Sequence, residues 1–185
     1  FNADGETYGG GGNDVSTGVE IAKEAAQYDM KVLLDFHYSD FWAEPAVQLI
    51  PKAWKKDVNN TEKMCSDVYD FTKESIQKFK DGGANIGMVQ VGNEITNGLL
   101  GIYSNRDKGE SFNVIWGDKK KSTEVNKYLK AGIKAVRECT PQALVALHLE
   151  TPNVWKYKTI MNTWKRDNVD YDVLGSSYYP CLLYT

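Results

Sequence analysis

The chain has few residues of the kinds that build metal sites, disulfide frameworks or membrane spans. Its 185 residues include 3 cysteines and 2 histidines. Cys65, Cys139 and Cys181 lie far apart and are odd in number, which fits free thiols or a single pair. No stretch is long and apolar enough to cross a bilayer, and no segment is basic enough to follow a phosphate backbone. We therefore expect no membrane span and no nucleic-acid partner.

What is present is typical of a globular domain. Hydrophobic residues make up 42% of the chain and charged residues 25%, with a net charge of −3. The one lysine run, at 119–121, is expected to be a solvated loop just before a helix. No signal peptide is visible, but the chain starts at Phe1 rather than Met, so this says nothing about its compartment.

Apolar stripes and apolar runs alternate along the chain. Asn13 or Asp14 and Thr61 are predicted helix caps, and Gly82 follows the second helical stripe. Helices are predicted over about 15–26, 61–81, 122–137 and 154–164, and strands over 31–36, 87–92, 143–147 and 172–177.

The strands are continuous apolar runs, which is typical of strands buried on both faces of a parallel sheet. Alternation with helices predicts an α/β fold. A doubly wound sheet lacks support, because the glycine run at 9–12 follows no strand and is expected to be a flexible turn. A full (β/α)₈ TIM barrel needs about 250 residues. We therefore predict a partial barrel, with residues 1–185 as one incomplete catalytic domain cut at both ends.

The segment Val-Gly-Asn-Glu-Ile at 91–95 closes the second strand. A barrel keeps its chemistry at the carboxyl ends of its strands. Retaining glycoside hydrolysis needs two carboxyl groups about 5–5.5 Å apart, one of which protonates the leaving oxygen. Glu94 is the candidate acid/base, kept protonated by a nearby anionic nucleophile, and Asn93 would bond the sugar 2-hydroxyl. The alternative is that the pair caps the strand exit and binds an Arg or Lys.

Other polar residues also follow strands. His37, Asp40, His148 and Glu150 could be combined into a metal site, because His and carboxylates bind divalent ions. The two histidines have no metal-type spacing, so we expect no metal. Glu150 is a weak candidate nucleophile, since nothing else distinguishes it.

Two long segments, 37–60 and 95–121, follow strands and are rich in aromatic residues. They suit an open cleft in which rings stack on the sugars of a polymer. The alternative is that the rings pack between sheet and helices. The aromatic residues concerned are Tyr38, Trp42, Trp54, Tyr103 and Trp116.

Several runs together resemble one known family. They are DFHYSDFWAEP at 35–45, VQVGNE at 89–94, VALH at 145–148 and SSYYP at 176–180, with the glycine-rich opening at 8–14. The chain resembles the arabinogalactan endo-β-1,4-galactanases of glycoside hydrolase family 53. The resemblance covers nearly the whole chain.

The resemblance implies a retaining barrel enzyme that cuts β-1,4-galactan internally. Glu94 matches the family's acid/base at the fourth barrel strand, and Asn93 matches its sugar-contacting neighbour. Trp42 resembles the stacking tryptophan beside the cleft. The residues expected to line the cleavage subsite are His37, Asp40, His148 and Tyr178.

The family's nucleophile is a Glu on the seventh strand, whereas this chain matches from the loop after the second strand to just past the sixth. The nucleophile is therefore expected outside this chain, and the ending at 181–185 departs from the family pattern. The resemblance implies no cofactor; calcium in some members sits near the final strands. It also implies a secreted, monomeric parent acting on galactan. A non-catalytic galactan-binding fragment, a different retaining barrel glycosidase and a metal-dependent barrel hydrolase remain alternatives.

Overall fold

Four parallel strands form the central sheet of the protein. In the computed structural model, which describes residues 12–179, these strands lie side by side in the order in which they occur in the chain. Parallel pairing confirms the expected α/β class. The strands are β1 (Val32–Phe36), β2 (Ile86–Val91), β5 (Leu144–Leu149) and β6 (Val173–Ser176).

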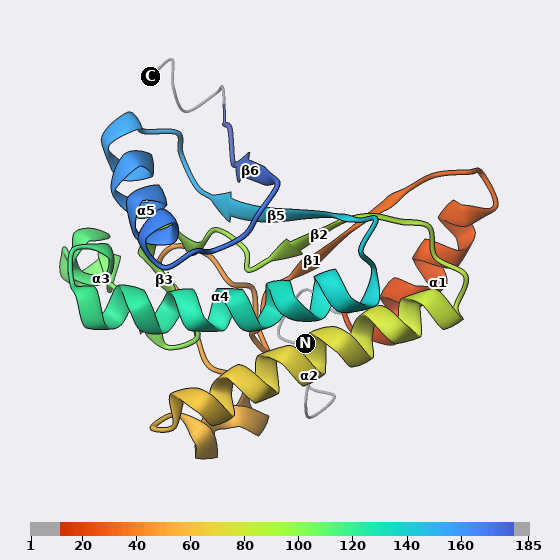
Figure 1. The fold of residues 1–185 in the computed structure, drawn as a ribbon, viewed down its shortest axis with the longest axis horizontal. Coiled ribbons are helices and arrows are strands. Elements are labelled where there is room, and N and C mark those ends of the chain that lie inside the picture. Colours follow the sequence, from red (N-terminus) through yellow and green to blue (C-terminus); the bar gives the residue numbers. More distant parts are fainter. Residues whose placement is uncertain (1–11, 180–185) are drawn as a thin grey trace.

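Helices connect these strands, as each parallel connection requires. The long helices α2 and α4 pack side by side on one face of the sheet, below it in Figure 1. The arrowheads of β2 and β5 point to the same side, where α3 (Asn113–Trp116) and β3 (Gly98–Leu99) also lie (Figure 1). The main helices are α1 (Val15–Ala26), α2 (Thr61–Asp81), α4 (Lys119–Cys139) and α5 (Val154–Arg166).

The core fills the space between the sheet and these helices. The strands contribute fully buried aliphatic side chains, and α4 faces them with the predicted stripe of Val125, Leu129, Gly132 and Val136. Burial of such side chains drives the packing. The strand residues of this core with no more than 2% exposure include Val89, Val91, Val145, Leu147 and Leu149.

Aromatic residues from the two long segments also enter the core, where an open cleft was expected. Tyr38, Trp54 and Trp116 are buried. The Tyr38 hydroxyl pairs with Thr72 at 2.8 Å, and burial raises the pKa of that hydroxyl. For these three rings the structure supports the alternative, because all three are part of the hydrophobic core.

On the opposite face of the sheet, side chains form rows across the strands. The pairing places Leu33, Met88 and Leu144 in one row, and Leu33 and Leu144 are 50% and 45% exposed. Asp35 and Gln90 share the next row toward the carboxyl ends. Side chains two residues apart on a strand lie on the same face, so Leu33 and Asp35 share this face, as do Met88 and Gln90. This face is therefore apolar near the strand starts and polar near the strand ends.

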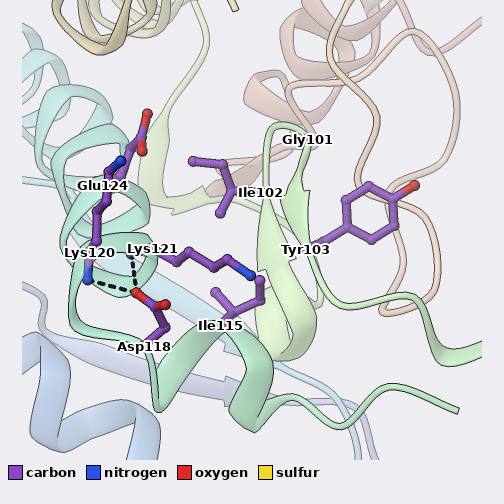
Figure 2. Close-up of a pocket in the computed structure, with 8 residues that line it drawn as sticks. All are labelled: Gly101, Ile102, Tyr103, Ile115, Asp118, Lys120, Lys121 and Glu124. Carbon is purple, nitrogen blue, oxygen red and sulfur yellow. Dashed lines mark hydrogen bonds between the residues drawn. The ribbon is translucent and has the colours of Figure 1, made fainter. Parts of the chain in front are cut away.

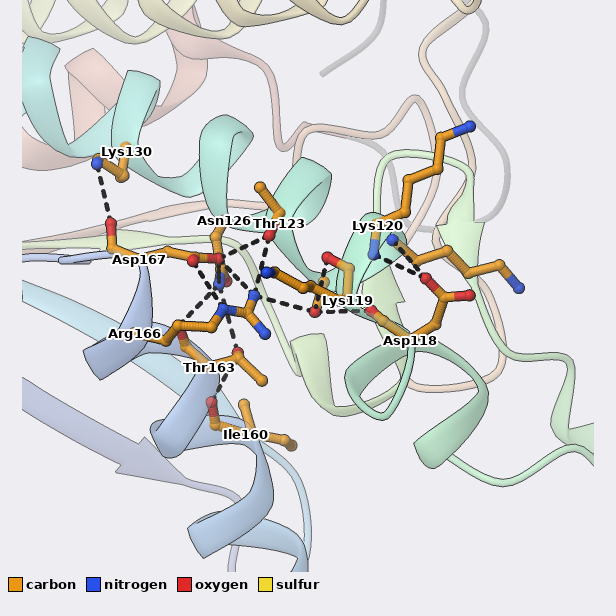
Figure 3. Close-up of polar contacts among 12 residues, drawn as sticks. Asp118, Lys119, Lys120, Thr123, Asn126, Lys130, Ile160, Thr163, Arg166 and Asp167 are labelled. Atoms are coloured by element: carbon orange, nitrogen blue, oxygen red, sulfur yellow. Dashed lines mark hydrogen bonds and ion pairs between the residues drawn. The ribbon is translucent and has the colours of Figure 1, made fainter.

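Helix α5 is fixed to α4 by a polar network, shown in Figure 3. The Asn126 amide donates to Asp167 Oδ2 at 2.8 Å and to the Thr163 carbonyl at 3.1 Å. Arg166 Nη2 lies 2.6 Å from Asp167 Oδ2 and 3.0 Å from the Thr123 hydroxyl. The Arg166 hydrogen bond holds the pKa of Asp167 well below its usual range. The network sets how α5, and so the following strand β6, lies against the rest.

One of the two predicted helix caps is found in the structure. Asp14 caps α1 by accepting from Thr17 N, and hydrogen bonds from the Ser16 hydroxyl and from Thr17 hold the pKa of its carboxyl well below its usual range. Asn60, and not Thr61, caps α2. The Thr61 hydroxyl instead donates to Glu124 Oε1 at 2.6 Å, which ties α2 to α4.

Helix α4 begins three residues before its predicted start. Asp118 accepts from the backbone of Lys120 and Lys121, and these bonds keep the pKa of its carboxyl low. The lysine run is thus the first turn of α4 and not a loop. The sequence prediction failed because a lysine-rich turn has no apolar stripe, while the capping Asp is the stronger signal.

The segment after β2 contains short elements where a loop was expected. The hairpin of β3 and β4 was not foreseen, because each strand has only two residues. The short elements after β2 are η2 (Ile95–Asn97), β3 (Gly98–Leu99), β4 (Ile102–Tyr103), η3 (Arg106–Lys108) and α3 (Asn113–Trp116), while η1 (Lys52–Asp57) lies in the other long segment, after β1.

Three expectations concern residues at the margins of the described part. Most of the glycine run at 9–12, and Cys181 with the ending at 181–185, lie outside the described residues. Cys65 and Cys139 carry free thiols. Within residues 12–179, none of the helices has the length and apolar character needed to span a bilayer.

Candidate active site

The turn after β2 places the Asn93–Glu94 pair. Its backbone is left-handed at Gly92, with φ +86°, and at Glu94, with φ +47°. A non-glycine residue in this region is uncommon and clusters at functional sites. The side-chain amide of Gln48, a residue with 1% exposure, donates to the Asn93 carbonyl at 2.9 Å. This hydrogen bond fixes the backbone of the turn after β2.

The Glu94 carboxyl faces strand β6. The Ser177 hydroxyl, one residue beyond the end of β6, donates to Glu94 Oε1. Across residues 12–179, no salt bridge involves Glu94, so the alternative of an ion pair with Arg or Lys is not found there. The carboxyl is thus held by a neutral hydroxyl, a partner that can either donate or accept.

The Asn93 side chain is oriented by three contacts. Its amide nitrogen donates to the Ala43 carbonyl at 2.8 Å, and its oxygen lies 2.9 Å from His148 Nδ1 and 3.3 Å from Gln90 Nε2. Because a carbonyl only accepts, the Ala43 contact fixes which end of the amide faces His148. The expected bond from Asn93 to a sugar hydroxyl stays a prediction.

His148 lies inside β5, one residue before its end, where the sequence had placed it just beyond the strand. Its Nε2 is 3.0 Å from the Ser177 hydroxyl. Burial lowers the pKa of its imidazole, while the nearby Glu94 and Asp35 carboxylates act in the opposite sense. We therefore expect a neutral ring at pH 7.

His37 is connected to the same group from the β1 side. Its Nδ1 accepts from Ala43 N at 3.0 Å, so the ring proton of the neutral form lies on Nε2, 3.2 Å from Asp35 Oδ2. The other Asp35 oxygen accepts from Gln90 Nε2 at 2.6 Å. The contacts thus join the ends of β1, β2, β5 and β6 into one polar cluster.

Three of the predicted residues lie outside this cluster. Asp40 Oδ2 accepts from Lys52 N at 2.6 Å, and its Oδ1 is buried without a partner. Trp42 is 59% exposed and stacks on Phe41, with ring centroids 6.3 Å apart. Tyr178 follows Ser177 and is also 59% exposed. Their roles in sugar binding stay predictions.

The carboxyl of Glu150, which was considered for a metal site, forms an ion pair with Lys156 at 3.1 Å. Among the residues that the structure describes, no three His, Cys, Asp or Glu side chains are grouped so that they could hold an ion.

Sequence reasoning missed four contributors to the cluster. Gln90 and Asp35 carried a usable signal, because each is a polar residue inside an otherwise apolar strand. Gln48 and Ser177 had none, since each lies in irregular backbone and only the folded chain brings it to Glu94.

A hollow of about 370 Å³ lies elsewhere, beside the β4 strand and the start of α4 (Figure 2). Ile102 and Ile115 form its apolar wall, and Lys120 and Lys121 lie across from them. Tyr103, one of the rings predicted for the cleft, lines it, but none of the residues of the cluster around Glu94 does, so the hollow is separate from that cluster.

We predict that Gly92→Ala destabilises the protein more than Gly109→Ala. Both glycines have positive φ, which costs alanine about 1–2 kcal/mol. At Gly92 the added Cβ would also lie 2.7 Å from Cγ2 of buried Ile95, and overpacking of this kind costs about 1–3 kcal/mol more. At Gly109 there is open space. Urea unfolding measures both; equal losses would contradict a tightly packed turn.

We also predict that His148 makes stability fall in mild acid. The pKa of the folded imidazole lies below its unfolded value of about 6.5, so the unfolded chain takes up the proton first. The free energy of unfolding should decrease as the pH drops from 6.5 toward the folded value, and His148→Gln should reduce this slope. A proton NMR titration with a His148 midpoint above 6.5 would refute the prediction.

A profile of glycosyl hydrolase family 53 matches residues 1–184. An endo-β-1,4-galactanase of Bacillus subtilis (strain 168) is 43% identical over 181 residues, which are 97% of this chain and 38% of that protein. An arabinogalactan endo-β-1,4-galactanase of Cellvibrio japonicus (strain Ueda107) is 34% identical over 173 residues, 90% of this chain and 42% of that protein.

Solved structures are similar as well. The Ignisphaera aggregans GH53 catalytic domain matches with a TM-score of 0.82 and 31% identity, covering 97% of this chain and 46% of that one. A structure of fungal β-1,4-galactanases matches with a TM-score of 0.73 and 26% identity, covering 92% and 48%. The chain thus spans less than half the length of these relatives. The predicted partial TIM barrel and the family resemblance are confirmed: this chain belongs to glycosyl hydrolase family 53.

Proposed function

We propose that this chain carries the acid/base half of a retaining endo-β-1,4-galactanase. The observation that supports this most strongly is the Glu94 carboxyl, which follows β2 at the carboxyl end of the sheet and pairs with a hydroxyl instead of a cation. The relatives named as galactanases point to β-1,4-galactan as the substrate.

In this mechanism Glu94 acts twice. Protonated, it gives its proton to the departing glycosidic oxygen while a second carboxylate attacks the anomeric carbon and forms a covalent glycosyl-enzyme. Ionised, it then takes a proton from the water that breaks this bond. A group with these two roles must keep its position while its charge changes.

We propose that the second carboxylate lies outside residues 1–185, in a longer protein of which this chain is a fragment. The coverage supports this: the chain accounts for 38% of the B. subtilis protein and 46% of the I. aggregans chain. The four described sheet strands are also half of the eight in a TIM barrel.

The remaining site residues would bind the sugar. Asn93 has an amide N–H beyond the one it gives Ala43, and we propose that it bonds the 2-hydroxyl. The exposed rings of Trp42 and Tyr178 offer apolar faces to pyranose rings. His37 and His148 supply polar groups at the same strand ends, and Asp40 is proposed to contribute through its buried, unpartnered oxygen.

Glu94→Gln in the longer protein should reduce kcat/KM on galactan by about 10²–10⁴-fold, the usual contribution of a general acid. With a 2,4-dinitrophenyl galactoside the loss in glycosyl-enzyme formation should be small, because that leaving group needs no proton.

The matched control is Glu150→Gln, at the end of the neighbouring strand, whose carboxyl pairs with Lys156. It should keep most of its activity on galactan. If Glu94→Gln hydrolyses galactan as fast as this control, Glu94 is not the acid.

The 185-residue chain alone should not hydrolyse galactan. Catalytic groups that act as a unit lose nearly all their effect when one is removed. Reducing-end release from potato galactan is the measurement. Sustained release of oligosaccharides by the purified chain would show that the second carboxylate is within it.

A further inference from the structure

We propose that Ser177 is a positioning residue that couples the hydrogen-bonding state of Glu94 to the tautomer of His148. The inference rests on the proposed function of Glu94 and adds a device that keeps its carboxyl in place in both charge states. It concerns a residue that follows β6 and touches side chains from β5 and from the turn after β2.

The first observation is the position of one hydroxyl. Ser177 Oγ donates to Glu94 Oε1 and lies 3.0 Å from His148 Nε2. A serine hydroxyl has one proton to give and lone pairs that accept. When it donates to one neighbour, it must therefore accept from the other.

The second observation is the surroundings of His148 Nδ1. The Asn93 oxygen, an acceptor, lies 2.9 Å from it, and the Glu94 backbone N–H, a donor, lies 3.3 Å from it. The Asn93 amide cannot turn around without losing its bond to the Ala43 carbonyl. Gln90 Nε2, a second donor, lies 3.4 Å from Nδ1. Either tautomer of His148 thus finds at least one partner at Nδ1, and the contact at Nε2 shifts the balance between them.

When Glu94 is protonated, its O–H donates to Ser177, whose hydroxyl donates to His148 Nε2. The ring proton then lies on Nδ1 and is given to the Asn93 oxygen. In this state the Glu94 backbone N–H has no acceptor at Nδ1, whereas the carboxyl, the Ser177 hydroxyl and both ring nitrogens are paired.

When Glu94 is ionised, both hydrogen bonds of the Ser177 hydroxyl reverse, and Nδ1 of His148 changes its partner. Ser177 donates to the carboxylate, a charge-assisted bond, and accepts from Nε2–H of His148. Nδ1 then accepts from the Glu94 N–H. The Asn93 oxygen keeps its contact with Gln90 Nε2 at 3.3 Å.

No proton passes along this row. The Ser177 hydroxyl only rotates, and the proton that Glu94 gives goes to the leaving oxygen. The tautomer changes by release of one proton from Nδ1 to water and uptake of one at Nε2, which the half-buried ring permits.

Other charged groups also face this ring. The Asp35 and Glu94 carboxylates favour its protonated form, while His37 and burial oppose it. Asp35 is already paired with His37 Nε2 at 3.2 Å and with Gln90 at 2.6 Å. Ser177 is therefore the group through which the charge of Glu94 reaches Nε2 by hydrogen bonds.

The tautomer can be read directly by ¹⁵N NMR of the full chain, which has only two histidines. At pH 8 His148 should be mainly the Nε2–H form. Ser177→Ala should shift the ratio toward Nδ1–H by at least about threefold, the effect of one hydrogen bond. Ser177→Thr keeps the hydroxyl and should restore the native ratio.

The matched control is Ser176→Ala, the preceding residue, whose hydroxyl lies 2.7 Å from Tyr157 Oη. It should leave the ratio unchanged. An unchanged ratio in Ser177→Ala, or an equal shift in the control, overturns the proposal. If Ser177→Ala does not fold, the wild-type spectrum still decides, since mainly Nδ1–H at pH 8 overturns it.

This readout requires no turnover. If the tautomer follows Ser177 but Glu94→Gln remains active on galactan, the coupling is real and the proposed function is wrong. If Glu94→Gln is inactive and the tautomer ignores Ser177, the function stands and the coupling fails.

Discussion

The hydrogen bond between Ser177 and Glu94 is the contact on which the site depends, because it joins the turn after β2 to the end of β6. It requires β6 to lie beside β5, and β5 beside β2, in the order that the parallel sheet provides. It also requires the left-handed turn at Gly92 and Glu94 to aim the carboxyl across the strand ends. A different strand order or a different turn would separate the Glu94 carboxyl from the Ser177 hydroxyl.

Around this contact, side chains from neighbouring strands hold each other in fixed orientations. Asp35 fixes Gln90, and the Ala43 backbone orients both Asn93 and His37. Such cross-bonded groups lose little freedom when a substrate binds, which is the condition for precise proton transfer. The next row of side chains on this face of the sheet, Leu33, Met88 and Leu144, is apolar. The polar cluster is therefore built directly on paired strands.

Much of this fold follows from the sequence, because buried parallel strands and amphipathic helices have strong patterns. Glu94 and His148 were identified because they end apolar runs. Ser177 was not, since a serine after a strand is unremarkable until the sheet order is known. The buried Trp54 and Trp116 were misjudged for a related reason: aromatic residues in irregular segments serve packing or binding equally well, and only burial separates the two.

The central claim is that Glu94 is the acid/base of a retaining enzyme, and azide tests it most directly. In Glu94→Ala of the longer protein, a 2,4-dinitrophenyl β-1,4-galactobioside still forms the glycosyl-enzyme, but no base activates water to break it. Azide needs no base and fits the space that the missing carboxylate leaves. The account predicts that azide accelerates turnover and that NMR identifies a β-galactosyl azide product. An α-azide, or no acceleration and no azide product, would contradict it.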